Sequence, residues 1–251
     1  MKLKDKVAIV TGSGHGLGHE IALAYAKEGA ALVLVARSQN EIEAVANEVR
    51  AFGGKALAIP TDVSVEEQVY RMVQKTVDEF GRIDILVNNA GGPLNSYSTP
   101  MWDLALSDWQ AVLDVNLTGT FLCSKAVLTH MMRQNSGVII NMSSGMGKRG
   151  KMGMSAYSAA KFAVEGLTQS MALETSAFNI RVNALDPGGL TATPGMIKKN
   201  LEKKPDQMLQ PAIISEVAVY LASGESVGVT GQSFTATIWN LDRQQIRSLL
   251  K

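Results

Sequence analysis

Short apolar runs alternate with longer amphipathic stretches along most of this chain. The runs are continuously apolar, which is typical of strands covered on both faces of a sheet. We expect strands at Val7–Val10, Ala31–Ala36, Ala56–Ile59, Ile83–Val87, Gly137–Met142 and Ile180–Leu185. Between them the pattern predicts helices at Glu20–Glu28, Glu41–Phe52, Val65–Phe80, Ser107–Asn135 and Ala156–Phe178.

This alternation predicts an α/β fold. Each parallel strand needs a crossover, so the sheet is expected to be parallel with helices on both faces. No linker or repeat interrupts the pattern, and residues 1–251 are therefore expected to form a single domain. The segment 188–210 is rich in proline, glycine and lysine, and we interpret it as a lid over the cleft. The alternative is a simple surface insertion.

Composition narrows the function classes. Apolar residues make up 46% and charged residues 19% of the chain, and the formal net charge is +1. These values are ordinary for a globular protein and give no reason to expect nucleic acid or a membrane surface as partner. The single cysteine, Cys123, excludes an internal disulfide. The chain shows no secretory signal and no apolar run of membrane-spanning length, so we expect a cytoplasmic protein.

A glycine-rich turn follows the first expected strand. It reads Thr11-Gly-Ser-Gly-His-Gly-Leu-Gly18 and opens the first helix. Without side chains, the backbone N–H groups of such a turn can approach a pyrophosphate at the positive helix end. We interpret it as a dinucleotide-binding turn; the alternative is a merely flexible turn.

The end of the second expected strand indicates which dinucleotide. NAD sites usually carry an acidic residue there, whereas this chain has Ala36 and then Arg37. A guanidinium suits a 2′-phosphate because it stays charged and can bond bidentately. We therefore predict NADP(H). His15 in the glycine turn either adds a donor or is simply solvated.

Several motifs together resemble one family. Tyr157 and Lys161 lie four residues apart, which alone would fit an ordinary surface helix. Ser144 lies 13 residues before Tyr157, just past an expected strand, and Asn116 lies in the preceding long helix. Asn88-Asn-Ala-Gly91 ends the fourth strand, and the glycines fit Thr-Gly-x-x-x-Gly-x-Gly. From Val7 to about Gly231 the chain resembles the short-chain dehydrogenase/reductase family and is similar to its 3-oxoacyl-(acyl-carrier-protein) reductases and related ketoreductases.

The resemblance implies a Rossmann-type doubly wound sheet of about seven strands and a catalytic set of Asn116, Ser144, Tyr157 and Lys161. Tyr157 would be the general acid, with a pKa lowered by the Lys161 ammonium. Ser144 would orient the reacting oxygen, and Asn116 would hold a water that links Lys161 to solvent. Ser143 is the rival to Ser144, and the spacing to Tyr157 favours Ser144.

The resemblance also implies a set of cofactor contacts. They are Gly12, Ser13, His15, Gly16, Leu17, Gly18, Arg37, Ser38, Asp62, Val63, Asn89, Ala90, Gly91, Tyr157, Lys161, Pro187, Gly188 and Leu190. Asp62 and Val63 would contact the adenine, and Pro187, Gly188 and Leu190 would shape the nicotinamide pocket. Asn89, Ala90 and Gly91 would lie along the cofactor. Each position after the third, fourth and sixth expected strands in this set could instead be a plain turn.

The chain departs from the family in two places. Asp186 stands before Pro187 where relatives usually have a small or apolar residue; it is a cap, a substrate contact or a solvated strand end. Either Thr191 or Thr193 would meet the carboxamide. After Gly231 the sequence is atypical, and an apolar stripe is expected to pack on the body or on a neighbouring subunit. Its members are Leu241, Ile246, Leu249 and Leu250.

Relatives are often tetramers, so the resemblance implies a homo-oligomer, a tetramer or alternatively a dimer, with the long helices around Asn116 and Tyr157 forming one interface. The expected partner is a small-molecule carbonyl or alcohol. Lys148, Arg149 and Lys151 form a basic run that is either a solvated loop or an attraction for anionic substrates such as carrier-bound acyl groups.

The expected activity is NADP(H)-dependent reduction of a ketone to a secondary alcohol. A sugar or polyol dehydrogenase is the alternative enzyme, and a non-catalytic NADPH-binding regulator is the alternative outside enzymes. Metal chemistry is not expected, because the three histidines have no partners at ligand spacing.

Overall fold

A computed structural model describes residues 1–92, 98–199 and 204–249. Seven parallel strands form one sheet in the order β3-β2-β1-β4-β5-β6-β7. The strands are β1 (Val7–Thr11), β2 (Ala31–Ala36), β3 (Ala56–Pro60), β4 (Ile85–Asn88), β5 (Gly137–Met142), β6 (Ile180–Asp186) and β7 (Ser233–Thr235). The expected single-domain, doubly wound parallel sheet is confirmed.

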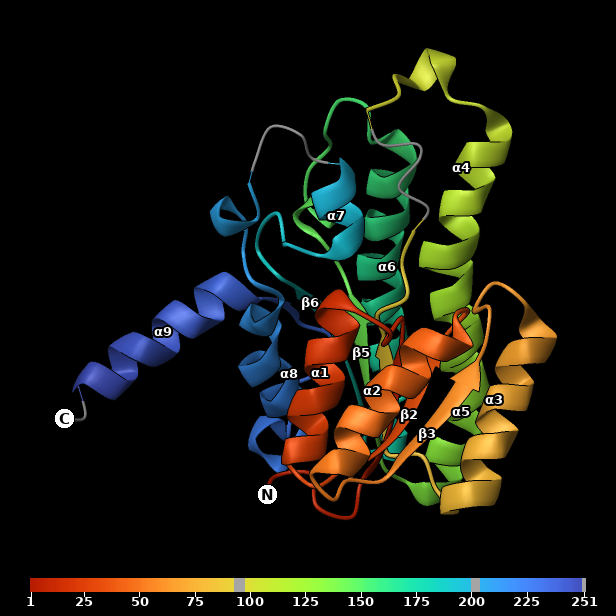
Figure 1. The fold of residues 1–251 in the computed structure, drawn as a ribbon, viewed down its shortest axis with the longest axis vertical. Coiled ribbons are helices and arrows are strands. Elements are labelled where there is room, and N and C mark those ends of the chain that lie inside the picture. Colours follow the sequence, from red (N-terminus) through yellow and green to blue (C-terminus); the bar gives the residue numbers. More distant parts are fainter. Residues whose placement is uncertain (93–97, 200–203, 250–251) are drawn as a thin grey trace.

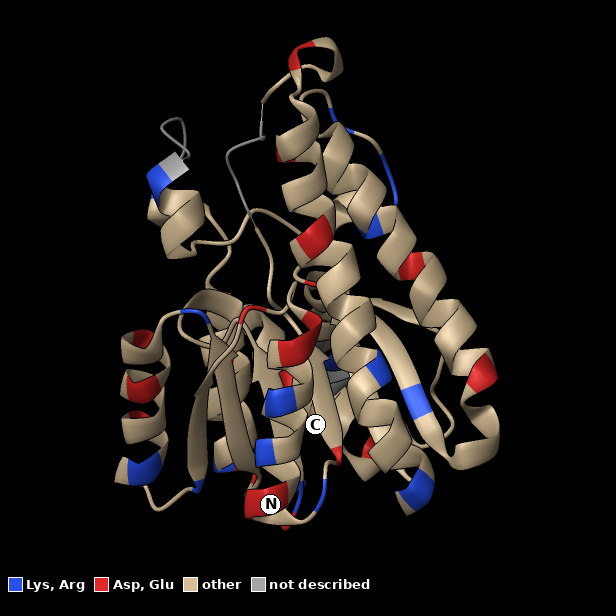
Figure 2. Ribbon diagram, turned by 90° about the vertical axis from the view of Figure 1, so that its right-hand side faces the viewer, with Lys and Arg blue, Asp and Glu red and all other residues tan. Residues whose placement is uncertain are grey.

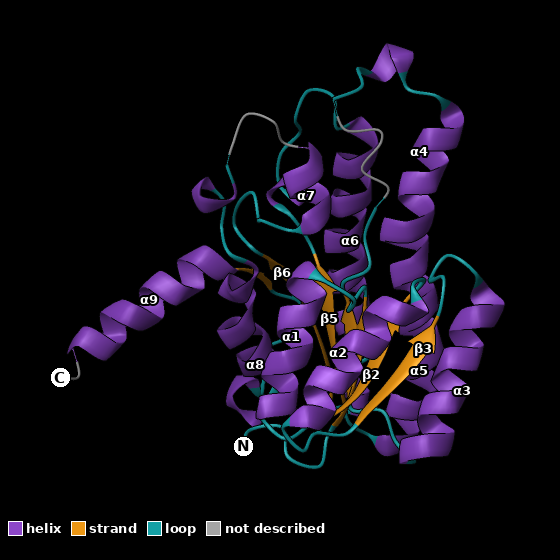
Figure 3. Ribbon diagram, in the orientation of Figure 1, coloured by secondary structure: helices purple, strands orange, loops and turns teal. Residues whose placement is uncertain are grey.

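Helices cover both faces of the sheet (Figures 1 and 3). One face carries α1 (Gly16–Lys27), α2 (Gln39–Ala51) and α8 (Ser215–Ala222), and the other carries α3 (Glu66–Phe80), α5 (Gly119–Gln134) and α6 (Ser155–Glu174). Alternate strand residues serve the two cores: Ala8 and Val10 join the first, Val7 and Ile9 the second. This explains the continuously apolar runs, since both faces of each strand are buried.

The chain order places a crevice at the centre of the sheet. It runs from β1 outward to β3 and then returns to β4, on the other side of β1. Loops that leave the carboxyl ends of β1 and β4 therefore diverge, and a ligand crevice is expected at such a switch point.

The long helix expected at Ser107–Asn135 is continuous but not uniform. It comprises α4 (Leu106–Leu113), a π-helical turn at Asp114–Thr118, and α5. By length and mean hydropathy (1.3) the span Leu106–Gln134 could cross a membrane, yet 44% of its most apolar window is buried inside the molecule. It packs against α3 and α6, as core helices that pass the same test do.

The region after β6 contains elements that the apolar pattern did not predict. They are β7, α7 (Pro194–Lys199), α8 and α9 (Ala236–Leu249). Within the expected lid, Thr191 and Leu209 form a short parallel bridge that closes the base of the segment. Residues 200–203 lie outside the described part, and the role as a lid stays a prediction.

The C-terminal helix α9 projects away from the body (Figure 1). Leu241, the stripe member whose side chain is described, is 58% exposed. The side chains of Ile246, Leu249 and Leu250 lie outside the described ones. The view in Figure 2 shows acidic and basic residues interspersed over the helices rather than gathered by sign.

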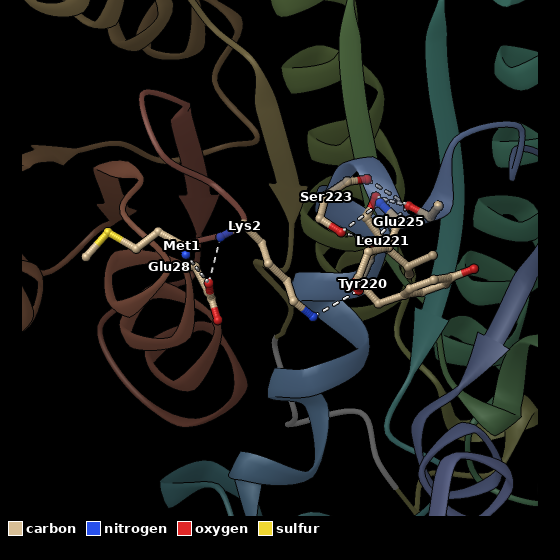
Figure 4. Close-up of polar contacts among 8 residues, drawn as sticks. Met1, Lys2, Glu28, Tyr220, Leu221, Ser223 and Glu225 are labelled. Carbon is tan, nitrogen blue, oxygen red and sulfur yellow. Dashed lines mark hydrogen bonds and ion pairs between the residues drawn. The ribbon is translucent and has the colours of Figure 1, made fainter. Parts of the chain in front are cut away.

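The N-terminus is tied to the end of α1 and to the turn that follows α8 (Figure 4). The Lys2 backbone N–H donates to Glu28 at 2.7 Å, and its Nζ pairs with Glu225 at 2.9 Å. A hollow of about 310 Å³ lies next to these residues, lined by side chains of both signs from α1, α8 and α9.

Candidate functional site

The glycine turn at the carboxyl end of β1 has no room for side chains. Gly12 and Gly16 have positive φ values of 63° and 61°. A Cβ on Gly18 would lie 2.2 Å from the Gly12 carbonyl oxygen, and one on Gly12 would lie 2.9 Å from the Ala90 Cα. The turn is therefore pressed against the loop after β4, and its backbone forms a bare cradle.

The loop after β4 holds that cradle in place. The Asn89 side-chain amide donates to the carbonyl oxygens of Thr11 and Gly12, each at 2.9 Å. The Thr11 hydroxyl in turn accepts from the backbone N–H groups of Asn89 and Ala90 at 3.0 Å. The Asn-Asn-Ala-Gly motif thus fixes the turn.

The cradle fits a dinucleotide pyrophosphate. His15, exposed and extended, precedes α1 without a side-chain cap, so the first-turn N–H groups face the crevice without that competitor. Leu17, the next side chain of the turn, is packed against the core. Ser13 differs from its expected role: it is fully buried, and both its hydroxyl and its N–H bond Val35 of β2. Its side chain serves the turn itself.

The end of β2 presents a cation. Arg37 is exposed and makes no hydrogen bond or ion pair with any residue that the structure describes. Ser38 caps α2, with its hydroxyl accepting from the Glu41 N–H at 3.4 Å. The Glu41 carboxylate reaches over the glycine turn, where a Cβ on Gly14 would lie 3.0 Å from Oε2. A phosphate beside Arg37 could therefore bind one unpaired guanidinium, with the Glu41 carboxylate close by.

The two residues expected to contact the adenine, Asp62 and Val63, differ in how available their side chains are. Asp62 uses Oδ1 to accept from the N–H and hydroxyl of Ser64, at 3.0 and 2.6 Å, and its Oδ2 bonds no described residue. Val63 is buried against Gly119 of α5, where a Cβ would lie 2.7 Å from it. Asp62 therefore keeps one acceptor free, whereas most of Val63 is used in packing.

Lys161 is the most unusual titratable group of the site. It is 5% exposed, and its Nζ donates to the Met142 carbonyl at the end of β5, at 2.8 Å. Burial lowers its pKa to about 8, and the nearby Glu165 carboxylate partly opposes that shift. Since an ammonium has three donors, two remain for other partners.

Tyr157 lies one helical turn before Lys161 on α6. The Lys161 Nζ is 5.6 Å from the centre of the Tyr157 ring, so the ammonium is close enough to influence the phenol. The ring packs against a small apolar cluster from α4 and α6 that includes Val112 and Ala160. The aromatic body is thereby fixed in position.

The two serines after β5 have different surroundings. Ser143 is buried and donates to the Glu165 carboxylate, which also accepts from Ser233. Ser144 is half-buried, and its hydroxyl accepts from the Met146 N–H at 3.2 Å. The 3-10 turn at Gly145–Gly147 that follows it packs against α6. Ser144 is the serine free to face a ligand, as the spacing had favoured.

Asn116 lies in the π-helical turn that packs against α6. Its amide nitrogen donates to the carbonyl oxygens of Gly92 and Val112. Its Oδ1 is buried and bonds no described residue, and a Cβ on Gly91 would lie 3.2 Å from it. A buried acceptor without a partner is a suitable place for an ordered water. Single π turns are common at functional sites, and the sequence pattern did not reveal this one.

The segment after β6 closes over the same crevice. Gly188 has φ +87°, and a Cβ there would lie 2.1 Å from the Thr237 hydroxyl. The next expected contact, Leu190, accepts from the Leu209 N–H through its carbonyl. Thr193 covers the glycine turn, with its Cγ2 2.9 Å from where a Gly16 Cβ would be, whereas Thr191 is buried and bonds Gly189. Thr193 is therefore the threonine placed toward the cofactor crevice.

Asp186 proves to be more than a solvated strand end. It is 2% exposed and accepts from the Lys148 ammonium at 3.1 Å and from the Gly188 N–H at 2.6 Å. Sequence reasoning left its role open because the partner lies 38 residues away. Within the described residues, no group of three or more metal-ligating side chains occurs.

Comparison with known proteins points to one family. The short chain dehydrogenase sequence family matches residues 6–204. The chain is 39% identical to a 3-oxoacyl-(acyl-carrier-protein) reductase of Synechocystis sp., covering 92% of this chain and 95% of the relative. It is 36% identical to a reductase of the same name from Thermotoga maritima, over 92% and 96%.

Solved structures agree with these relatives. A short-chain dehydrogenase/reductase from Mycobacterium marinum superposes with a TM-score of 0.86 at 34% identity, covering 93% of this chain and 94% of the other. Levodione reductase superposes equally well, at 33% identity over 93% and 96%. A structure from Beutenbergia cavernae with bound NADP also has a TM-score of 0.86, at 31% identity over 94% and 96%.

Proposed function

The chain belongs to the short-chain dehydrogenase family and is an oxidoreductase of that family, and we propose that it is an NADP(H)-dependent ketone reductase that also oxidises the corresponding secondary alcohol. One observation carries the proposal: the buried Lys161 ammonium lies beside the Tyr157 ring, and Ser144 follows the neighbouring strand end. This is the arrangement that proton donation to a forming alkoxide requires.

The cofactor, when bound, supplies the hydride. Tyr157 then donates its phenolic proton to the carbonyl oxygen, because the Lys161 charge stabilises the phenolate left behind. Ser144 donates a hydrogen bond to the same oxygen and orients it. The free acceptor of Asn116 holds a water through which the proton is replaced. In the oxidative direction Tyr157 acts as the base.

The preference for NADP(H) rests on Arg37. Its guanidinium is exposed and without a described partner at the end of β2, where a 2′-phosphate would lie. The relative with bound NADP agrees with this preference. The glycine cradle and the start of α1 would hold the pyrophosphate.

Carrier-bound 3-oxoacyl groups are the first substrates to try, because two relatives are named as reductases of that class. Gluconate 5-dehydrogenase, the activity in the name of the NADP-bound structure, makes sugar ketones the second class. Reduction of either ketone requires one proton on the carbonyl oxygen, which Tyr157 would supply in both cases.

To test this proposal, the rates of NADPH and NADH oxidation are measured by absorbance with a panel of neutral and carrier-bound ketones. The wild type is compared with Arg37→Asp. We expect the wild type to prefer NADPH. The carboxylate should repel the 2′-phosphate and reduce kcat/KM for NADPH by about a hundredfold, with little loss for NADH. Arg133→Asp, at an exposed arginine in the last turn of α5, controls for net charge. A variant that keeps the wild-type preference would refute the assignment of NADP(H).

A further inference from the structure

A buried carboxylate at the end of β6 has no role in the proposed chemistry. Asp186 is 2% exposed and accepts three hydrogen bonds. Its Oδ1 accepts from the Gly188 N–H at 2.6 Å; its Oδ2 accepts from the Lys148 Nζ at 3.1 Å and from the Thr235 hydroxyl at 3.0 Å. Burial of a charge is costly unless it is paired, so this arrangement needs the lysine.

The lysine comes from the loop that carries the catalytic serine. Lys148 lies four residues after Ser144, and its Nζ also donates to the Thr235 hydroxyl at 3.2 Å. The lysine side chain is 43% exposed as a whole, and its ammonium contacts the buried carboxylate. Three segments thus meet at one carboxylate: the Ser144 loop, the turn after β6, and β7.

The turn on the other side of Asp186 is a wall of the proposed nicotinamide pocket. Pro187 and Gly188 follow Asp186 directly, and the Gly188 N–H is held by its carboxylate. Gly188 packs closely against β7, because a Cβ there would lie 2.8 Å from the Thr235 methyl group. A shift of Asp186 would therefore shift the turn.

We propose that Lys148 and Asp186 form a positioning pair that holds the Ser144 loop in register with the Pro187–Gly188 turn. The inference rests on the proposed function, in which Ser144 orients the carbonyl and the turn faces the nicotinamide. The pair fixes the distance between these two parts, and with it the approach of the carbonyl carbon to the hydride.

The ion pair also indicates which residues of the basic run 148–151 are available to attract an anionic substrate. All three residues are exposed, but Lys148 is paired with Asp186, whereas Arg149 and Lys151 form no ion pair with a described residue. Any attraction for an anionic substrate therefore comes from Arg149 and Lys151, and Lys148 affects neutral and anionic ketones alike. A comparison of neutral with anionic ketones therefore distinguishes a positioning role of Lys148 from attraction of substrate charge.

The experiment compares Lys148→Met, Lys148→Arg, Asp186→Asn and the double variant Lys148→Met/Asp186→Asn, with Arg149→Met as the matched control. One readout is hydrogen–deuterium exchange of residues 144–151 and 186–190 without added cofactor. The other is kcat and KM on a neutral ketone with NADPH, together with the Kd for NADPH.

We expect Lys148→Met to raise exchange in both segments and to lower kcat by about tenfold, with the NADPH Kd nearly unchanged, because misplacement affects the reacting geometry rather than binding. Lys148→Arg should recover most of the loss. The double variant should be no worse than the more harmful single one, since the two residues act as a unit. Arg149→Met should behave as the wild type.

Unchanged exchange in Lys148→Met, or losses that simply add in the double variant, would overturn the positioning pair. If the wild type reduces no ketone of the panel, the proposed function is contradicted. The exchange data would still decide whether the two segments are linked. The two failures are therefore distinguishable.

Discussion

At the scale of single residues, the sequence indicated candidate catalytic residues but not their surroundings. The spacing to Tyr157 favoured Ser144 over Ser143, and the Ser143 hydroxyl donates to Glu165. It could not show that Lys161 is buried or that Ser13 is used by β2, because both depend on distant packing partners. The role of Asp186 was undecided for the same reason, because its partner Lys148 is distant in the sequence.

The burial of Lys161 predicts a pH-dependent stability. Its pKa is about 8 in the folded protein and 10.5 when unperturbed. Between these values the unfolded chain binds more protons, so this group makes the folded state more stable as the pH rises from 8 to 10.5. The full effect is of order 3 kcal/mol, at about 1.4 kcal/mol per pKa unit.

Urea unfolding of the wild type and of Lys161→Met at several pH values measures this contribution. The difference in unfolding free energy between the two proteins should shift in favour of the wild type as the pH rises through this window. Other groups that titrate there, such as Cys123, whose thiol pKa burial raises to about 12, cancel in the comparison. A difference that does not vary with pH would contradict the lowered pKa of Lys161.

At the scale of elements, the strands were the most predictable feature. Those buried on both faces were located to within two residues, because their continuously apolar runs are too short for typical helices. The three-residue β7 was not, since it is too short to form a run. Helix α1 begins at Gly16 rather than Glu20, because the glycines that suit a turn also form its first residues.

The π-helical turn at Asp114–Thr118 shows a different limit. Its residues have the same polarity pattern as an ordinary helix, so the pattern gives no sign of the widened turn, which packs against α6. It directs Asn116 so that one amide group fastens the loop at Gly92 and the free oxygen points to Gly91. The sequence indicated Asn116 as a candidate residue, but the direction of its side-chain amide depends on the geometry of the π turn.

At the scale of the whole molecule, two exposed aromatic residues lie on the helices that the resemblance assigns to an interface. Phe121 on α5 is 46% exposed and Phe162 on α6 is 48% exposed. Exposed aromatic side chains are enriched at interfaces between subunits. We propose that this helix pair joins two copies of the chain.

Light scattering of the wild type and of Phe121→Glu/Phe162→Glu tests the assembly. We expect the wild type to have the mass of a dimer or tetramer and the variant a smaller mass, because a buried carboxylate without a partner is costly. Phe52→Glu, at a 47% exposed phenylalanine after α2, is the matched control and should not change the mass. A monomeric wild type would refute the interface.

The central claim is that Tyr157 supplies the proton, and the most direct measurement is kcat of Tyr157→Phe with NADPH and the best ketone of the panel. Removal of one hydroxyl should reduce kcat by at least about a hundredfold. The Kd for NADPH, followed by fluorescence, should stay within about threefold of the wild type, since the ring still packs against α4 and α6. Tyr70→Phe, at an exposed tyrosine on α3, should retain full activity. A Tyr157→Phe protein that keeps kcat within a few-fold of the wild type would contradict the account.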